Sequence, residues 1–468
     1  MRKDGKTGYP RPRYPKFKRI SAKKLAEKIR SIVEQPVIEG LEHQPHVPRY
    51  GIKKGDKVLV IALTEYDQVV VNEYVNAAKG CGAAVDLLLL DSTPEMPADR
   101  IAVAEAMSIA PLGDKERIYT RITNLINPKV VTAMVESEGY DLVIAGTAGP
   151  IPRVPYRWTR MQYISQEEFS SPQIDFPFDL QKLIDDKVYE AIKSFESVRI
   201  TDPEGTDLSF TNYDDKRPQA MIHEYGKPIN FGFGGREDCS GVVAGTLNHL
   251  GAFPHCKAII KDGLVVDVEG GGEYGKVWRE KIQEYNNIDF PEYPIRSAMA
   301  LPGEEVPKIK MDRKGFFWFW ECAIGTTPGV FRLESEGKMQ CFANFLHDRK
   351  RSGYLHHGFG GANNSASALM KAGLPWTHVH IHNMFATYEG TTKDGTKVKV
   401  IDKGHLTALD NPDVRKLAKK YGNPDKLLSE VWIPAVPGIN VKGSYEKYAS
   451  NPSKWITQDA ALHPVLRA

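Results

Sequence analysis

The chain has 468 residues, of which 41% are hydrophobic and 26% are charged, which is the composition of an ordinary globular protein. This composition excludes a chain that is disordered throughout, and the length allows two to four domains of about 100–200 residues each. No apolar run approaches the roughly 18 residues of a membrane-spanning helix, and no apolar segment follows the basic N-terminus. We therefore expect no membrane anchor and no secretory signal.

Five cysteines lie far apart, at positions 81, 239, 256, 322 and 341, and no two of them form a CxxC pair. An odd count with this spacing argues against both a disulfide framework and a thiolate zinc site. The cysteine pattern therefore predicts a reducing compartment, and we expect a cytoplasmic protein.

Positive charge is concentrated at the N-terminus. Residues 1–30 carry 12 Lys and Arg against 2 acidic residues, although the net charge of the whole chain is only +3. A basic arm of this kind can contact nucleic acid, but the rest of the chain is acidic and contains no nucleic-acid-binding motif. We expect the arm to be solvated or packed on a partner subunit, and nucleic-acid binding is the alternative.

The sequence up to residue 195 alternates between helical and strand patterns. The expected elements are a helix over 22–35 opened by Ser21, a strand over 57–63, a helix over 67–79, a strand over 84–90, a helix over 128–138, a strand over 140–145 and a helix over 179–195 opened by Asp179. Continuous apolar strands separated by helices are typical of a parallel sheet that is covered on both faces. We predict a basic extension and helix over 1–48, followed by an α/β domain with a mainly parallel sheet over 49–195.

The pattern changes after residue 195. The segment Ser197–Phe210 alternates apolar and polar residues around a turn at Asp202–Gly205, which predicts a β-hairpin with one solvated face. Glycine-rich turns recur at 232–235, 270–272 and 358–361. We therefore predict an α+β domain with antiparallel strands over 196–468, and the histidines described next make it the candidate metal-binding domain.

Histidine supplies the strongest indication of chemistry. Six of the 13 histidines lie between residues 347 and 382, and three of them, His378, His380 and His382, alternate along one apolar segment. On a strand this alternation places the three imidazoles on one face. Imidazole is the commonest metal ligand in proteins, so the pattern predicts a metal site. The alternative is a polar, solvated strand face.

Two further features point to the same half of the chain. His356 and His357 come directly before a glycine-rich segment, where the backbone can approach a ligand closely. Glu321 follows the aromatic run 316–320, and a carboxylate at the end of such a strand is costly to bury unless it is paired or bound to a metal. An exposed glutamate at a strand end is the alternative. The predicted α/β domain contains no dinucleotide fingerprint, and the sequence contains no Walker A loop, HExxH or GxSxG motif.

Several stretches resemble the aminopeptidase T family of metallopeptidases, in the order and spacing of that family. They are Gly51–Leu63, Arg199–Phe210, Val268–Tyr274, Glu321–Pro328 (for the family's Glu-x-x-x-Gly-Thr-Asn-Pro), Gly353–His356 and His380–Met384 (for its His-x-Asp-x-Met). The resemblance implies an α/β N-terminal half and a metal-binding C-terminal half. It also implies metal ligands at Glu321, His356, His380 and His382.

The sequence departs from this family at two ligands. His382 stands where the family has an aspartate, and the family's earlier ligand glutamate has no counterpart in the segment 248–258. Because bridging carboxylates hold two metals together, the present set suits one divalent metal better than two. The chain is similar in this respect to the family's 2,5-dihydroxypyridine dioxygenase branch, which uses one non-haem iron. We expect Fe(II), with Zn²⁺ or Mn²⁺ as alternatives.

The leading hypothesis is a mononuclear Fe(II) dioxygenase that opens the ring of an oxygenated aromatic or cyclic small molecule. His357, His378 or His347 would then act as the catalytic acid or base. A close variant is a hydrolase that opens a ring with Zn²⁺ or Mn²⁺ and water, without O₂.

Two other hypotheses remain open. In a metallo-aminopeptidase, carboxylates such as Glu237, Asp238 and Glu273 would replace the missing ligands. In a metal-stabilised binding protein, the protein would fill every coordination position. We expect a homo-oligomer, a dimer or larger, with no membrane partner.

Overall fold

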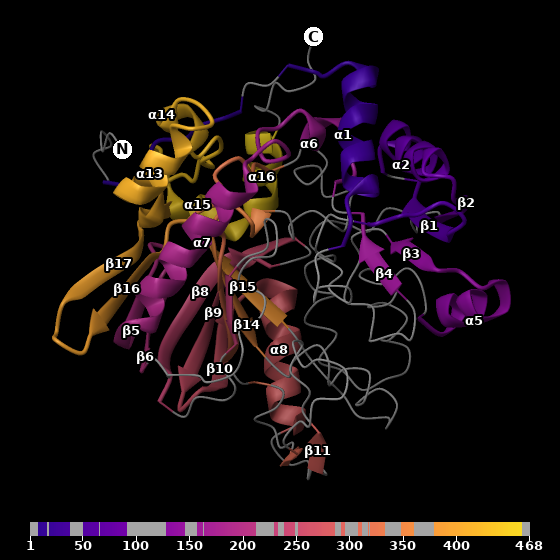
Figure 1. Ribbon diagram of the computed structural model, residues 1–468. Helices are drawn as coiled ribbons and strands as arrows, with labels where there is room; N and C mark the ends of the chain where they lie inside the picture. The colour runs from indigo at the N-terminus through magenta and orange to yellow at the C-terminus, as the bar shows by residue number, and fades with distance from the viewer. Residues whose placement is uncertain are drawn as a thin grey trace.

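The computed structural model describes residues 8–15, 18–37, 50–64, 66–90, 128–145, 157–161, 163–211, 229–232, 238–248, 251–285, 292–294, 308–310, 317, 319–332, 348–359 and 379–460. Their strands form a parallel sheet near the N-terminus and antiparallel sheets later in the chain (Figure 1). Within these ranges no helix is long and apolar enough to cross a membrane, and the four described cysteines form no disulfide.

The N-terminal sheet has four strands in the order β2-β1-β3-β4, and each neighbouring pair is parallel. The strands are β1 (Lys57–Leu63), β2 (Ala84–Leu90), β3 (Leu142–Ala145) and β4 (Arg157–Arg160). The helices around the sheet are α1 (Ala22–Glu34), α2 (Gln68–Gly80), α5 (Pro128–Glu138) and α6 (Gln166–Phe169). The sequence patterns predicted β1 and β2 at these bounds, and α1, α2, α5 and β3 within two residues.

Alternate residues of β1 enter two different cores. Val58 and Val60 pack in the core that contains α1 and α2, whereas Leu59 and Ile61 pack with Val135 of α5. Successive side chains of a strand point to opposite faces, so helices cover both faces of this sheet. This confirms the expectation of a covered parallel sheet.

Of the two helix N-caps predicted from the sequence, one is confirmed and the other is wrong. Ser21 caps α1 by accepting a hydrogen bond from the amide of Lys24. Asp179 was predicted to open the next long helix, and this is wrong: α7 (Phe178–Lys193) begins after Pro177, which makes no side-chain cap. Asp179 lies in the first turn of the helix instead, where a negative charge interacts favourably with the helix dipole. Its carboxylate accepts a hydrogen bond from the hydroxyl of Tyr421 at 2.5 Å.

The C-terminal part contains an eight-stranded and a four-stranded antiparallel sheet, in addition to the two-stranded pair β11–β12. The eight-stranded sheet has the order β10-β9-β8-β6-β5-β16-β17-β18, and the four-stranded sheet has the order β15-β14-β13-β7. The strands of the large sheet are β5 (Phe195–Thr201), β6 (Asp207–Thr211), β8 (Ser240–Leu247), β9 (Ala252–Lys261), β10 (Leu264–Gly270), β16 (Thr387–Thr392), β17 (Lys397–Asp402) and β18 (His405–Leu406). Those of the small sheet are β7 (Ile229–Gly232), β13 (Phe319–Ile324), β14 (Leu355–Phe359) and β15 (Val379–Asn383). The pair β5–β6 is the predicted hairpin.

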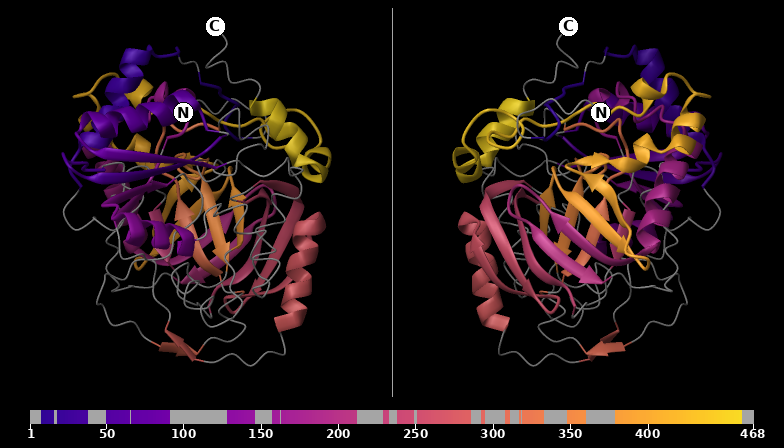
Figure 2. Two further views of the ribbon diagram at one scale, coloured as in Figure 1. Left: turned by 90° about the vertical axis from the view of Figure 1, so that its right-hand side faces the viewer. Right: turned by 90° about the vertical axis from the view of Figure 1, so that its left-hand side faces the viewer.

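Helices and short elements complete the C-terminal part. They are β11 (Glu292–Pro294), β12 (Lys308–Lys310), α8 (Gly272–Tyr285), the 3₁₀ helix η1 (Thr407–Asp410), α13 (Pro412–Ala418), α14 (Pro424–Leu427), α15 (Tyr445–Ser450) and α16 (Pro452–Ala460). Helix α8 packs along β9 and β10 at one end of the large sheet (Figure 2). The expected glycine turn at 270–272 leads into α8, whereas the one expected at 358–361 begins inside β14.

The described part of the basic arm packs on its own chain. Arg13 forms a two-way backbone bridge with Ile433, at N–O distances of 3.0 and 2.8 Å. The ring of Tyr9 makes an edge contact with Phe385, at a centroid distance of 5.9 Å. The arm was expected to be solvated or packed on a partner subunit. Residues 8–15 instead pack against their own chain, near the end of β15.

The two antiparallel sheets approach closely at Gly245 of β8. A Cβ atom at this position would lie 2.8 Å from the carbonyl oxygen of His382 and 2.7 Å from a methyl carbon of Ile381. The side-chain amide of Asn383 also donates to the carbonyl of Ala244 at 2.7 Å. A residue without a side chain therefore sets the distance between β8 and β15.

We expect Gly245→Ala to lower the free energy of unfolding by about 1–3 kcal/mol, because the new methyl group overpacks the contact between the sheets. Gly80→Ala is the matched control, since a Cβ at Gly80 meets no atom within 4 Å. Urea unfolding of both variants measures the difference. An unchanged midpoint for Gly245→Ala would contradict this account of the sheet contact.

Candidate functional site

Strands β14 and β15 bring three of the predicted metal ligands together. In their antiparallel register His356 lies opposite His382, and Gly358 lies opposite His380. Alternate residues of a strand share a face, so the three histidines occupy the same side of the sheet. Each is at most 1% exposed, and their ring centroids are 5.6, 5.7 and 6.1 Å apart. The structure therefore contains a buried cluster of three imidazoles.

The other predicted ligands and acid/base residues are described only in part. Glu321 lies in β13, where its backbone pairs with Gly358 of β14. Gly358 in turn pairs with His380 of β15, so β14 separates Glu321 from His380. The side chain of Glu321, together with His347 and His378, lies outside the described residues. The alternation predicted over residues 378–382 is thus observed for His380 and His382.

His357 lies on the opposite face of β14 from His356. Its Nε2 atom forms a hydrogen bond with the Oδ1 atom of Asn383 at 3.0 Å. Its ring packs against Phe319, with 5.8 Å between the two ring centroids. Burial lowers the pKa of His357 to about 3, although the hydrogen bond to Asn383 opposes this shift. The imidazole is therefore neutral at physiological pH. Its catalytic acid/base role stays a prediction, and this placement favours a structural role.

Asn383 joins the face that carries His357 to the large sheet. Its Oδ1 atom also accepts a hydrogen bond from the hydroxyl of Thr206 at 3.0 Å, while its Nδ2 atom donates to Ala244. All of these groups are buried, so leaving one unpaired would cost about 1–3 kcal/mol. The network therefore fixes the end of β15 that carries His382.

Two tyrosines contact the histidines of β15. The hydroxyl of Tyr274, in α8, donates to the backbone carbonyl of His380 at 2.8 Å. The hydroxyl of Tyr354, which directly precedes β14, lies 2.8 Å from the Nδ1 atom of His382. Neither tyrosine was predicted from the sequence to have a role. Tyr354 could have been found from the alternation, because it stands two residues before His356 and so extends the same face.

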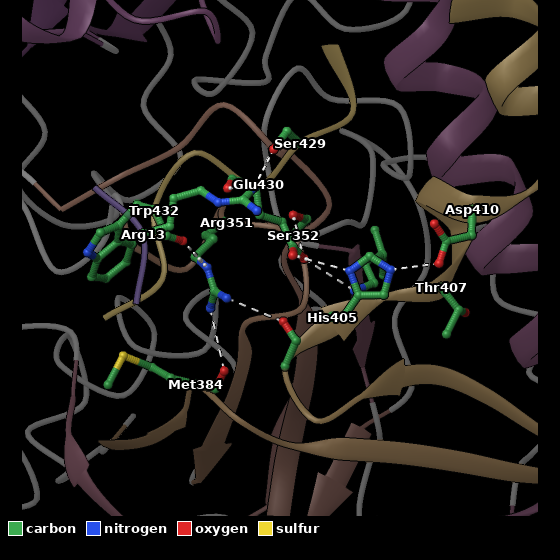
Figure 3. Close-up of polar contacts among 12 residues, drawn as sticks. Arg13, Arg351, Ser352, Met384, His405, Thr407, Asp410, Ser429, Glu430 and Trp432 are labelled. Atoms are coloured by element: carbon green, nitrogen blue, oxygen red, sulfur yellow. Dashed lines mark hydrogen bonds and ion pairs between the residues drawn. The ribbon is translucent and has the colours of Figure 1, made fainter. Parts of the chain in front are cut away.

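A buried arginine holds the start of β14 against the end of β15. Arg351 donates hydrogen bonds to the backbone carbonyls of Trp432 at 3.0 Å, Met384 at 3.4 Å and Gly404 at 3.3 Å (Figure 3). Met384 is the residue directly after β15. The guanidinium therefore links both strands that carry the imidazole cluster to the C-terminal segment.

His405 stabilises the same region through two carboxylates. Its ring nitrogens contact Asp410 at 2.9 Å and Glu430 at 3.2 Å, and Glu430 accepts a hydrogen bond from Ser352 at 3.3 Å (Figure 3). Burial alone would lower the pKa of His405, but the hydrogen bonds and charges of the two carboxylates outweigh it and raise the pKa to about 9. A protonated His405 therefore neutralises the buried charge beside the turn that leads to β14.

The three imidazoles lie further apart than the histidine ligands of one bound metal. Within the described ranges, no group of three or more His, Cys, Asp or Glu side chains is close enough to hold a metal ion without rearrangement. Imidazoles that share one tetrahedral metal, with nitrogens at about 2.1 Å, have ring centroids roughly 5 Å apart. The separations of 5.6, 5.7 and 6.1 Å are wider than this by about 1 Å or less. Binding one metal would require the three side chains to move closer together, so the metal site at this cluster stays a prediction.

The two described carboxylates that were predicted for a second metal, Asp238 and Glu273, make other contacts. Asp238 accepts hydrogen bonds from the backbone amide and hydroxyl of Thr211. Glu273 is 69% exposed and lies 3.7 Å from Lys276, whereas the three histidines are buried. Glu237 lies outside the described residues. The described candidates therefore supply no bridging carboxylate to the imidazole cluster.

Comparison with known proteins leaves the family open. No family model and no curated protein matches the chain. Among solved structures, 2,5-dihydroxypyridine dioxygenase from Pseudomonas putida KT2440 is 12% identical, with a TM-score of 0.41 over 83% of this chain and 98% of that chain. Wild-type AmpT from Thermus thermophilus is 15% identical, with a TM-score of 0.39 over 82% of this chain and 99% of that chain. Likenesses at these TM-scores carry no argument about the activity of this chain.

We expect His405→Gln to destabilise the protein most at low pH. The unfolded histidine has a pKa near 6.5, so the ion pairs contribute fully below that pH and are lost as the pH rises through about 9. The free energy of unfolding should fall by up to about 3 kcal/mol at pH 6 and change little at pH 10. Urea unfolding at both pH values measures this, and an equal loss at the two would contradict the ion-pair account.

Proposed function

We propose that this chain is an enzyme that binds one divalent metal through His356, His380 and His382, with Glu321 as a candidate fourth ligand. The observation that supports the proposal is the buried cluster of three imidazoles on one sheet face. Protonating all three would place like charges about 6 Å apart in a region of low dielectric constant. Burial and proximity therefore favour the neutral form, which is the form that binds metal.

The arrangement of the ligands favours catalysis over a purely structural metal. Three histidines on one face of a sheet can occupy only one side of a metal, which leaves the other side for a substrate. The three imidazoles are neutral, so only the single negative charge of Glu321, as the candidate fourth ligand, would compensate the charge of the ion. A divalent ion held there would polarise an oxygen atom of the substrate, and iron would add reaction with O₂.

We propose the ring of an oxygenated aromatic or cyclic small molecule as the substrate, and Fe(II)-dependent ring opening with O₂ as the leading reaction. An imidazole-rich set with few carboxylates suits one iron, and the described carboxylates give no support to a two-metal aminopeptidase. Hydrolytic ring opening with Zn²⁺ or Mn²⁺ is the variant. His347 and His378 are the candidates for proton transfer to the substrate, since His357 is held by Asn383 on the other face.

The test is to load the purified chain anaerobically with Fe²⁺, then add hydroxylated pyridines and phenols with O₂. We expect about one iron per chain and O₂ uptake that matches the loss of ring absorbance. His380→Ala and His382→Ala should each weaken metal binding by about tenfold or more and abolish uptake. Metal analysis by mass spectrometry and an oxygen electrode provide the readouts.

His255→Ala is the matched control, because His255 is a half-buried histidine of β9 that hydrogen-bonds the carbonyl of Glu204 at 2.6 Å. It should keep both metal and activity. Full metal content in both cluster variants would refute the metal site. Metal binding without O₂ uptake, together with hydrolysis of amino-acid amides, would instead replace ring opening by the aminopeptidase reaction.

A further inference from the structure

Two acidic side chains are buried together in the turn between β5 and β6. Asp202 is 8% exposed and Glu204 is 5% exposed. Their hydrogen-bond donors among the described residues are backbone amides and hydroxyls, and no Lys, Arg or His side chain is one of these donors. A buried carboxylate without a cationic partner is costly to ionise, so this turn favours a protonated carboxyl group.

The partners of the two carboxyl groups indicate which one carries the proton. Asp202 accepts hydrogen bonds from the amides of Glu204 at 2.8 Å and Phe385 at 3.2 Å, one on each oxygen. An amide can only donate, so both bonds favour an ionised Asp202. Glu204 accepts the hydroxyls of Thr246 at 3.0 Å and Tyr445 at 3.1 Å, both on Oε1. A proton on Oε2 leaves these two bonds in place, so the proton of the pair belongs on Glu204.

The electrostatics of the turn agree with this assignment. Burial and the charge of Asp202 raise the pKa of Glu204 to about 8, although the two hydroxyls oppose the shift. Burial raises the pKa of Asp202 to about 7, against the effect of its two amide donors. Glu204 therefore keeps its proton to a higher pH than Asp202 does, and its ionisation places two negative charges in one buried turn.

Titratable and charged groups on neighbouring segments surround the pair. They are Tyr9 of the N-terminal arm, Tyr445 and Tyr448 of α15, Asp402 of β17, and His255 and Lys257 of β9, with Glu269 as the ion-pair partner of Lys257. Nε2 of His255 donates to the carbonyl of Glu204 at 2.6 Å, and burial lowers the pKa of this histidine. Burial raises the pKa of both Tyr9 and Tyr445. His255, Tyr9 and Tyr445 therefore stay neutral between pH 7 and pH 9, where Glu204 ionises.

We propose that Glu204 is a pH-sensitive latch, which holds α15 against the turn between β5 and β6 while it is protonated and releases α15 when it ionises. The protonated carboxyl group links the turn to β8 through Thr246 and to α15 through Tyr445. Ionisation adds repulsion from Asp202, whose other oxygen holds the amide of Phe385. Phe385 follows β15 by two residues, so the latch also fastens the end of that strand. This device is independent of a bound metal.

The first test compares Glu204→Gln with Glu446→Gln, an exposed glutamate of α15, by urea unfolding between pH 5 and pH 10. Glutamine keeps an acceptor oxygen but cannot ionise. The folded pKa of Glu204, about 8, lies above its ordinary value of 4.5, so the stability of the unaltered chain falls as the pH rises through this interval. The folding equilibrium constant of Glu204→Gln, relative to the unaltered chain, should therefore rise up to about tenfold per pH unit between pH 5 and pH 8 and then level off. The control ratio should stay constant, and a constant ratio for Glu204→Gln would overturn the latch.

A second measurement does not depend on a variant folding. Hydrogen exchange of the α15 amides is followed in the unaltered chain by mass spectrometry and corrected for the intrinsic exchange rate at each pH. We expect α15 to lose protection about tenfold between pH 7 and pH 9, because ionised Glu204 favours the open turn. Unchanged protection of α15 over this range would overturn the proposal.

Discussion

The pairing of β14 with β15 in a single register determines which histidines share a face. His356 opposite His382 and Gly358 opposite His380 place three imidazoles together. A slip of one residue in either strand would send its histidines to the opposite face, against the large sheet. The candidate site therefore depends on whatever holds this register.

Contacts on one face of the two strands and at their ends hold it. On the face toward the large sheet, Gly245 allows β8 to lie against β15, and Asn383 is hydrogen-bonded to Ala244, Thr206 and His357. At the ends of the strands, Arg351 links the start of β14 to the residue after β15. Each buried polar group is costly to leave unpaired, so the contacts favour one register over its neighbours.

The sequence predicts the elements whose signals are local. The apolar run of β1, the cap at Ser21 and the alternation of His380 and His382 all arise within a few residues. By contrast, α7 was predicted from its helical pattern, yet its buried face joins the core of the antiparallel sheets. That core begins with β5, directly after the helix, and extends to Leu428. The domain boundary near residue 196 stays a prediction.

The residues that support the site could not be predicted from the sequence, because their contacts are to residues far away in the chain. Arg351 and Tyr274 act through backbone carbonyls that lie 33 to 106 positions away, and no spacing rule reports such contacts. His357 shows the opposite case. It stands beside His356 in the sequence, but the period of two that unites His380 and His382 also separates these neighbours onto opposite faces.

The most direct test of the account is a crystal structure of the iron-loaded chain, with anomalous scattering recorded at the iron edge. We predict one anomalous peak per chain, at about 2.0–2.2 Å from a nitrogen of each of His356, His380 and His382. A peak at any other position, or none in a chain that retains its iron in solution, would contradict the metal site on which the proposed function rests.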